Sequence, residues 1–161
     1  MICITGTPGT GKSAVLEELG RRGHRVHEFD SISGGCVVGI ERGEKVVDED
    51  CLKNITVEEI TAGHLSHYAN CDIVIVLRSH LKDIYQRLRK REYERKKIME
   101  NVESEAIDLI GYEAESIHPG RTVEVMNESI METADIIESI IAGEKFPLGK
   151  IDLMEEILDW Y

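Results

Sequence analysis

The string Gly6-Thr7-Pro8-Gly9-Thr10-Gly11-Lys12-Ser13 matches the pattern G-x-x-x-x-G-K-[ST] at every position. These residue types suit phosphate, because glycines let successive backbone N–H groups turn inward toward phosphate oxygens. The flexible ammonium of Lys12 suits the β- and γ-phosphates of a nucleotide, and the hydroxyl of Ser13 suits Mg²⁺. We therefore predict a site for ATP and Mg²⁺, with Ser13 as the metal ligand. The candidate nucleotide contacts are Gly9, Gly11, Lys12, Ser13 and Ala14.

The residues on either side of this string support that interpretation. Met1 to Thr5 is apolar and short enough for a buried strand, and the segment from Lys12 carries Val15, Leu16 and Leu19 at helical spacing. A helix that begins at the loop directs its positive dipole end at a bound phosphate. The alternative, a glycine-rich turn with an incidental lysine, does not explain this context. The motif indicates a nucleotide site, and it does not by itself identify a reaction.

The remaining chain must position this loop, and its pattern alternates strands with helices. Because strands that alternate with helices of this length favour a parallel sheet covered on both faces, we predict an α/β, three-layer P-loop fold. A chain of 161 residues is the size of one domain, here 1–161. Residues 30–53 contain four glycines and no clear period, and we expect them to be irregular. Further strands are expected at 25–29, 55–61, 72–77 and 122–126, and helices at 81–90, 96–117, 128–141 and 151–161.

Composition excludes several classes of protein. No apolar run approaches the roughly 18 residues of a membrane span, and no charged segment followed by an apolar one marks a secretory signal, so we expect a cytoplasmic protein with no membrane partner. The four cysteines are scattered without C-x-x-C spacing. In that compartment we expect them to be reduced, small apolar residues rather than a disulfide framework or a zinc site. These cysteines are Cys3, Cys36, Cys51 and Cys71.

The net charge of −12 argues against non-specific binding of nucleic acid over the whole surface. The distribution is uneven, because nine of the 19 Lys and Arg residues lie between Arg78 and Lys97 together with three acids. That segment therefore carries +6 and the rest of the chain −18. It is either a place built for a polyanion or a solvated helix face with pairs such as Glu92 and Lys96.

Several stretches beyond the loop resemble one family. The chain resembles the small nucleoside monophosphate kinases, and most closely the archaeal and nuclear adenylate kinase isoenzyme 6 family, over most of the segment from Met1 to about Ile117. The Lys-Ile-x-Glu-Asn-Val-x-x-Glu stretch is more specific to this family than the phosphate loop. The matching stretches are Ile4 to Ser13, Gly63-His64-Leu65-Ser66-His67, Asp72 to Arg78, Arg87 to Tyr93 and Lys97 to Glu105.

The resemblance implies roles for particular residues. Residues 30–53 would be the acceptor-nucleotide region and residues 90–100 the lid, from which Arg91 would reach the transferring phosphates. Arg87 and Arg91 share a helix face at i,i+4 spacing, which agrees with this role, although a surface arginine is the alternative. His64 would position an attacking water or the γ-phosphate, or else cap a strand end. The spacing of His64 and His67 is H-x-x-H, but without a third ligand it does not predict a transition-metal site.

The chain departs from the family pattern at two positions. The family carries an acidic residue immediately before the Gly-His pair, as a partner of Mg²⁺, where this chain has Ala62. It also tends to have glycine between the lid arginine and tyrosine, where this chain has Glu92. The carboxylates that we consider as replacements for the missing acid are Glu59, Asp30 and Asp48.

These observations lead to a hypothesis and two alternatives. The leading interpretation is a nucleoside monophosphate kinase that acts on ATP and AMP, with accompanying ATPase activity and, by resemblance, a link to small ribosomal subunit maturation. The first alternative is an ATP-driven ribosome assembly factor with little kinase activity, whose partners would be a small-subunit ribosomal protein and its rRNA. The second is a small-metabolite kinase of the same fold. The expected catalytic residues are Lys12, Arg91 and His64.

Overall fold

Five parallel strands form the central sheet of the protein, which a computed structural model describes over residues 1–161. The strand order is β2-β5-β1-β6-β7, so β1 lies in the middle, where Ile2 is in register with Ile60 on one side and Ile73 on the other. All five strands run in the same direction, so their carboxyl ends meet at one edge. The strands are β1 (Ile2–Thr5), β2 (Val26–Glu28), β5 (Ile60–Ala62), β6 (Ile73–Arg78) and β7 (Thr122–Met126).

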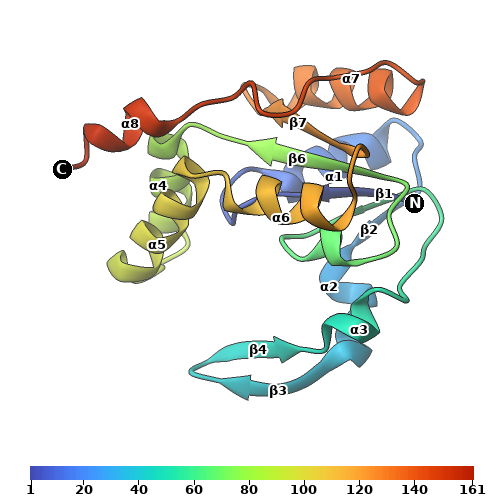
Figure 1. The fold of residues 1–161 in the computed structure, drawn as a ribbon, viewed down its shortest axis with the longest axis horizontal. Coiled ribbons are helices and arrows are strands. Elements are labelled where there is room, and N and C mark those ends of the chain that lie inside the picture. Colours follow the sequence, from blue (N-terminus) through green and yellow to red (C-terminus); the bar gives the residue numbers. More distant parts are fainter.

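Helices cover both faces of this sheet, as the three-layer prediction requires (Figure 1). Side chains alternate along β1, so Ile4 packs on one face with helices α1 and α7, while Cys3 packs on the other face with Ala114 of α6. A third cluster joins α4, α5 and α8 beyond the end of the sheet. No helix combines the length and apolar character needed to cross a bilayer. The helices are α1 (Lys12–Arg21), α4 (Leu81–Lys90), α5 (Arg95–Ala106), α6 (Leu109–Ile117), α7 (Ile130–Ile141) and α8 (Met154–Leu158).

Residues 30–53 are more regular than the sequence predicts. An antiparallel hairpin of β3 (Val37–Glu41) and β4 (Glu44–Val47) projects from the body of the molecule, flanked by the short helices α2 (Phe29–Ile32) and α3 (Glu49–Leu52) (Figure 1). Arg42 and Gly43 both have positive φ, as tight hairpin turns of mirror-image type require. Both strands are largely exposed, with Ile40 72% accessible. Buried and exposed residues therefore do not alternate along them, and the sequence lacks the apolar alternation by which a strand is recognised.

The expectation of reduced cysteines is wrong. Cys3 is bonded to Cys71, and Cys36 to Cys51, with Cα atoms 5.9 Å and 5.4 Å apart. Both separations fall within the range that a disulfide spans. The prediction used spacing along the chain and the usual chemistry of the cytoplasm, and neither reveals that partners 68 and 15 residues apart meet in space. The first pair joins β1 to the segment before β6, and the second closes the base of the hairpin.

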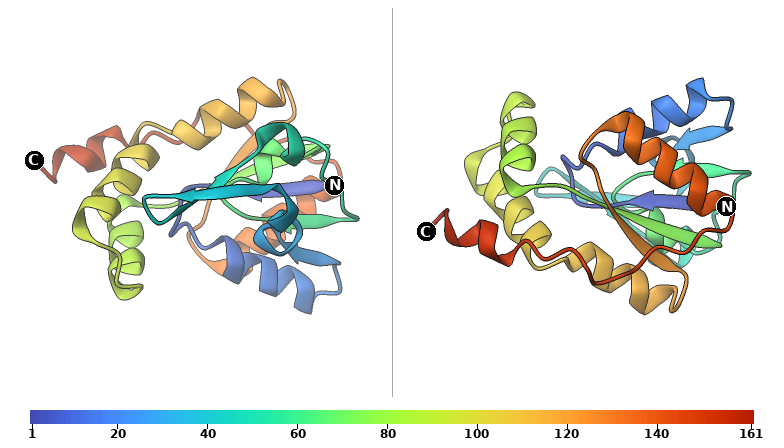
Figure 2. Two further views of the ribbon diagram at one scale, coloured as in Figure 1. Left: turned by 90° about the horizontal axis from the view of Figure 1, so that it is seen from below. Right: turned by 90° about the horizontal axis from the view of Figure 1, so that it is seen from above.

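The predicted helix at 96–117 is two helices. The chain turns at Asp108, whose φ of +55° ends α5, and whose carboxylate accepts a hydrogen bond from the N–H of Gly111 to cap α6. Aspartate tolerates this left-handed conformation better than most residues. The two helices therefore diverge, and α5 packs beside α4 at one end of the molecule, while α6 lies along the sheet (Figure 2). The strand expected at 55–61 and the helix expected at 151–161 are also shorter than predicted, at Ile60–Ala62 and Met154–Leu158.

Candidate functional site

The glycine-rich loop connects the carboxyl end of β1 to the first turn of α1, in the position predicted from the sequence. Gly6 has a φ of +143°, and a Cβ atom there would lie 2.5 Å from the carbonyl oxygen of Leu77 on β6. Gly11 has a φ of +93°, and a Cβ atom there would lie 2.4 Å from Nδ2 of Asn127. Any side chain at either position would therefore collide with the sheet edge as well as strain the backbone. The glycines let the loop lie directly on the strands that surround it.

Lys12 is tethered to the loop from within. Its ammonium donates hydrogen bonds to the carbonyl oxygens of Gly6 (2.7 Å) and Thr7 (2.9 Å). Burial lowers the pKa of Lys12 to about 7, against the opposing attraction of Glu105, and the nearby charge of Arg91 lowers it further. A bound phosphate would supply the negative charge that this ammonium needs. Lys12 is therefore placed and electrostatically prepared for an anion.

Two residues that sequence analysis did not assign hold the loop from outside. The amide of Asn127 donates to the carbonyl oxygen of Thr10 (2.8 Å), and its own oxygen accepts from the hydroxyl of Thr133 (2.8 Å). Arg87 of α4 donates to the carbonyl oxygen of Gly9 (2.9 Å). Asn127 directly follows β7 and therefore lies at the carboxyl edge of the sheet, where ligand-binding residues gather in open α/β sheets. That position could have identified Asn127 as a candidate site residue from the sequence. The sequence placed Arg87 in the basic segment and in a stretch that resembles the family, and it gave no sign of this contact with the loop.

A cavity of about 620 Å³ opens over the loop. It is bounded by the loop itself, the hairpin, the segment after β5, and the turn between α4 and α5 together with α5. Ala14 lies in the first turn of α1 and does not line it. The structure thus brings most of the sequence-predicted site residues to one cavity, and these are Gly9, Gly11, Lys12, Ser13, His64 and Arg91.

Arg91 stands at the carboxyl end of α4, where the chain turns toward α5. The turn passes through Glu92, whose φ of +60° is in the left-handed region that glycine adopts without strain. This position therefore favours glycine, although the chain has a glutamate there. Beyond the turn, Lys97 of α5 forms an ion pair with Glu44 of the hairpin, and this pair bridges two walls of the cavity.

The two histidines of the H-x-x-H spacing lie in different environments. His64 is exposed to the cavity, and burial followed by the charge of Lys12 lowers its pKa, so its imidazole is neutral at pH 7. His67 is fully buried, bonded through Nδ1 to the hydroxyl of Thr5 (2.7 Å), and burial lowers its pKa to about 4. Only His64 is free to contact a ligand. No three His, Cys, Asp or Glu side chains gather to form a metal cage.

The acids considered as replacements at Ala62 are separated by the fold. Glu59 precedes β5, at the opposite edge of the sheet, and accepts from the N–H of Arg25. Asp48 caps α3 by accepting from the N–H groups of the next turn. Asp30 does line the cavity, and so does Glu28, which was not considered. Glu28 ends β2 in direct register with Ala62 on β5, so it occupies the same edge one strand away.

Comparisons with known proteins agree with this architecture. The family model described as an AAA domain matches residues 2–108. A protein of Archaeoglobus fulgidus named "Putative adenylate kinase" is 36% identical over 99% of this chain and 94% of its own length. A protein of the same name from Methanothermobacter thermautotrophicus is 39% identical over 94% of this chain and 96% of its own length. A crystal structure of a Thermus thermophilus protein superposes with a TM-score of 0.53 at 15% identity, covering 89% of this chain and 97% of that one, which supports the fold alone.

Proposed function

The chain belongs to the AAA-domain family and to the archaeal relatives named "Putative adenylate kinase", and on that premise we propose that it is a nucleoside monophosphate kinase that transfers the γ-phosphoryl group of ATP to AMP. The observation that carries the proposal is the single cavity that joins the loop, the hairpin and Arg91. A kinase of this kind must hold a donor and an acceptor together, and the loop occupies only one side of this cavity. The names of the relatives support the same reaction class.

The residues at the loop fit Mg²⁺. The hydroxyl of Ser13 and the carboxylates of Glu28 and Asp30 line one cavity, and they are hard oxygen donors of the kind that this ion prefers. Mg²⁺ in nucleotide sites is held by one or two protein oxygens together with phosphates, so a complete protein cage is not needed. We assign Ser13 as the ligand and Glu28 as the carboxylate that takes the place of the acid missing at Ala62. When bound, the ion neutralises charge on the β- and γ-phosphate oxygens.

The chain's own side chains perform the remaining tasks. Lys12 leaves its loop carbonyls to bind the β- and γ-phosphates, and Arg91 neutralises the charge that gathers on the phosphoryl group in transfer. His64, neutral at pH 7, donates a hydrogen bond to the γ-phosphate or to a water beside it. The phosphate of AMP is already anionic, so no general base has to activate it.

The walls of the cavity divide between acceptor and lid. We assign residues 30–53, which contain the hairpin, to the acceptor nucleotide, and residues 90–100 to the lid. Closure of the lid would exclude water and favour transfer over hydrolysis. The ion pair of Lys97 with Glu44 joins these two segments across the cavity, so closure acts on both nucleotides together.

Nucleotide turnover tests this proposal. The protein is supplied with Mg²⁺-ATP alone and then with each nucleoside monophosphate in turn, while ADP and free phosphate are followed separately. We expect ADP formation that depends on AMP and releases little free phosphate. Sugar acids and coenzyme precursors belong in the same screen, and a preference for one of them would replace AMP by a small metabolite.

A second candidate is an ATPase that acts in maturation of the small ribosomal subunit. The charge distribution favours it, because an acidic protein with basic residues concentrated in 78–97 offers separate surfaces to a basic ribosomal protein and to rRNA. Part of that segment is not surface, however, since Arg78 is buried and Arg87 is bonded to the loop. Phosphate release that ignores every monophosphate would favour this candidate. Both candidates place the protein in the cytoplasm, where their substrates are.

A further inference from the structure

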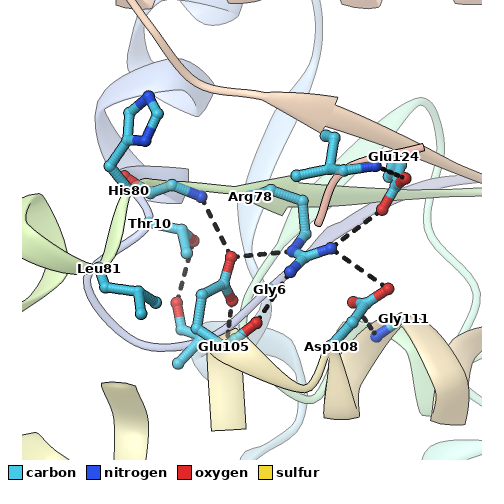
Figure 3. A network of polar contacts seen from close by, with 12 residues as sticks. Gly6, Thr10, Arg78, His80, Leu81, Glu105, Asp108, Gly111 and Glu124 are labelled. Atoms are coloured by element: carbon cyan, nitrogen blue, oxygen red, sulfur yellow. Dashed lines mark hydrogen bonds and ion pairs between the residues drawn. The ribbon is translucent and has the colours of Figure 1, made fainter. Parts of the chain in front are cut away.

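A buried group of charges lies directly behind the phosphate loop (Figure 3). Arg78, the last residue of β6, has a side chain that is only 1% exposed. Its Nε donates to Oε1 of Glu105 (2.9 Å), and its Nη1 donates to Glu124 (3.0 Å) on the neighbouring strand. The carboxylates of Glu105 and Glu124 are equally buried, at 2% and 1% exposed. Charges this deep persist only when they are paired and hydrogen-bonded, so the group has one defined arrangement.

Glu105 does more than balance Arg78. The hydroxyl of Thr7 donates to its Oε2 at 2.6 Å, and the backbone N–H of Ser79 donates to its Oε1 at 3.1 Å. Thr7 is part of the loop, and its carbonyl oxygen accepts the ammonium of Lys12 and the hydroxyl of Thr10. The residue that anchors Lys12 is therefore held from outside by a charge-assisted hydrogen bond, which is stronger than a neutral one.

Glu105 belongs to the helix that forms one wall of the cavity. It lies in the last turn of α5, while Lys97, Asn101 and Ser104 of the same helix line the cavity. The backbone of Glu105 is fixed as well, because its carbonyl oxygen accepts from Arg78 (2.8 Å). A helix moves as a rigid element, so a shift of α5 displaces this carboxylate relative to Thr7. The loop and the wall of the cavity are thus mechanically joined at one hydrogen bond.

We propose that Glu105 is a positioning residue, which holds Thr7 so that the loop is shaped for phosphate only when α5 is in place. This role rests on the proposed phosphoryl transfer and concerns the same site. It differs from a purely structural role in its prediction for Thr7. If Glu105 served only to neutralise Arg78, the Thr7 hydroxyl would not matter for turnover.

The test uses substitutions of Thr7, because they leave Arg78 paired. Thr7→Val keeps the side-chain shape and removes the hydroxyl, and Thr7→Ser restores a hydroxyl. A hydrogen bond to a charged group contributes about 1.5–3 kcal/mol, which corresponds to about a 10- to 150-fold loss of kcat/KM for ATP in Thr7→Val. Because a misshapen loop would bind the phosphates of ATP less well, we expect KM for ATP to carry most of this loss, and Thr7→Ser to stay within about three-fold of the parent.

Two further variants complete the design. Thr122→Val removes another buried hydroxyl, which donates to the carbonyl oxygen of His118 at the opposite edge of the sheet, and it should leave kcat and KM unchanged. Glu105→Gln keeps the shape of the side chain. Because Glu105→Gln also removes the charge that pairs with Arg78, the double variant should lose more turnover than Thr7→Val alone, but less than the sum of the two single losses if both residues act through one bond.

The outcomes separate this inference from the proposed function. Thr7→Val within two-fold of the parent, or effects of Thr7→Val and Glu105→Gln that simply add, would overturn the positioning role. If the parent protein phosphorylates no acceptor, the kinase proposal fails. The positioning role is then decided by calorimetric affinity for a non-hydrolysable ATP analogue, which should weaken about 10-fold or more in Thr7→Val and recover in Thr7→Ser.

Discussion

Asp108, at the junction of α5 and α6, should make the stability of this protein depend on pH in an unusual direction. Its Oδ2 lies 3.2 Å from Nη1 of Arg78, and its Oδ1 accepts from the N–H of Gly111. Burial raises the pKa of Asp108 from 3.8 to about 6, because the attraction of Arg78 is offset by repulsion from Glu124 and Glu105. One buried arginine is thus shared among three carboxylates, and its attraction does not outweigh the cost of burying the charge of Asp108.

The sign and size of the effect follow from linkage. The pKa of Asp108 is higher in the folded state than in the unfolded state. Its contribution to the free energy of unfolding is therefore fully present below about pH 4, and it is lost as the pH rises through 6. A shift of about two pKa units corresponds to about 3 kcal/mol. Because the side chain is 28% exposed, solvent screens part of this, and we expect about 1–2 kcal/mol.

The perturbation is Asp108→Asn, which preserves the shape, tolerates the positive φ and still accepts from Gly111. It removes the ionisation, and the amide nitrogen that then faces Arg78 in place of Oδ2 changes stability by an amount that does not depend on pH. Urea unfolding at several pH values from 4 to 8 should show the variant gaining about 1–2 kcal/mol relative to the parent as the pH rises, with no further change above about 7. Asp108→Ala, which also loses the cap, should be less stable at low pH yet gain by the same amount. A difference between Asn variant and parent that stays flat, or that shrinks as the pH rises, would refute the reasoning.

Two further predictions concern the cavity, and a third concerns the disulfide at the base of the hairpin. Because the pKa of Lys12 is lowered to about 7, this side chain is mostly uncharged at pH 8, and ATP binding should make it take up a proton. The binding enthalpy measured by calorimetry should then change with the ionisation enthalpy of the buffer. A binding enthalpy that is the same in all buffers would contradict this prediction. Arg91→Ala should lower kcat by about 10³-fold. Arg89 is an exposed neighbour that does not line the cavity, so Arg89→Ala should leave kcat unchanged. Equal effects of the two substitutions in a turnover assay would show that Arg91 does not act in the site. Replacing Cys36 and Cys51 together by alanine should cost about 3 kcal/mol in denaturant unfolding, from the loop entropy of their 15-residue separation, and an unchanged midpoint would show that the pair is not bonded.

The sequence by itself was enough for the layered fold and the phosphate loop. Both depend on local information, because a glycine pattern, an apolar strand and an amphipathic helix can each be recognised within about ten residues. The buried strand at Ile73–Arg78 and the helix at Leu81–Lys90 agree with their predicted ranges to within one residue at either end. The hairpin was missed because its strands are exposed, so no alternation of burial selected its residues.

Only the tertiary structure decided which distant residues support the loop. Glu105 meets Thr7 across 98 residues, and Asn127 meets Thr10 across 117. The disulfides join residues 68 and 15 apart, and Asp108 breaks what reads as one helix because its carboxylate finds both Arg78 and Gly111. Contacts of this kind arise from the packing of whole elements, which no short window of sequence contains. The phosphate-loop motif can thus be recognised from a short stretch of sequence, while the groups that hold the loop in shape come together only when the sheet and its helices assemble.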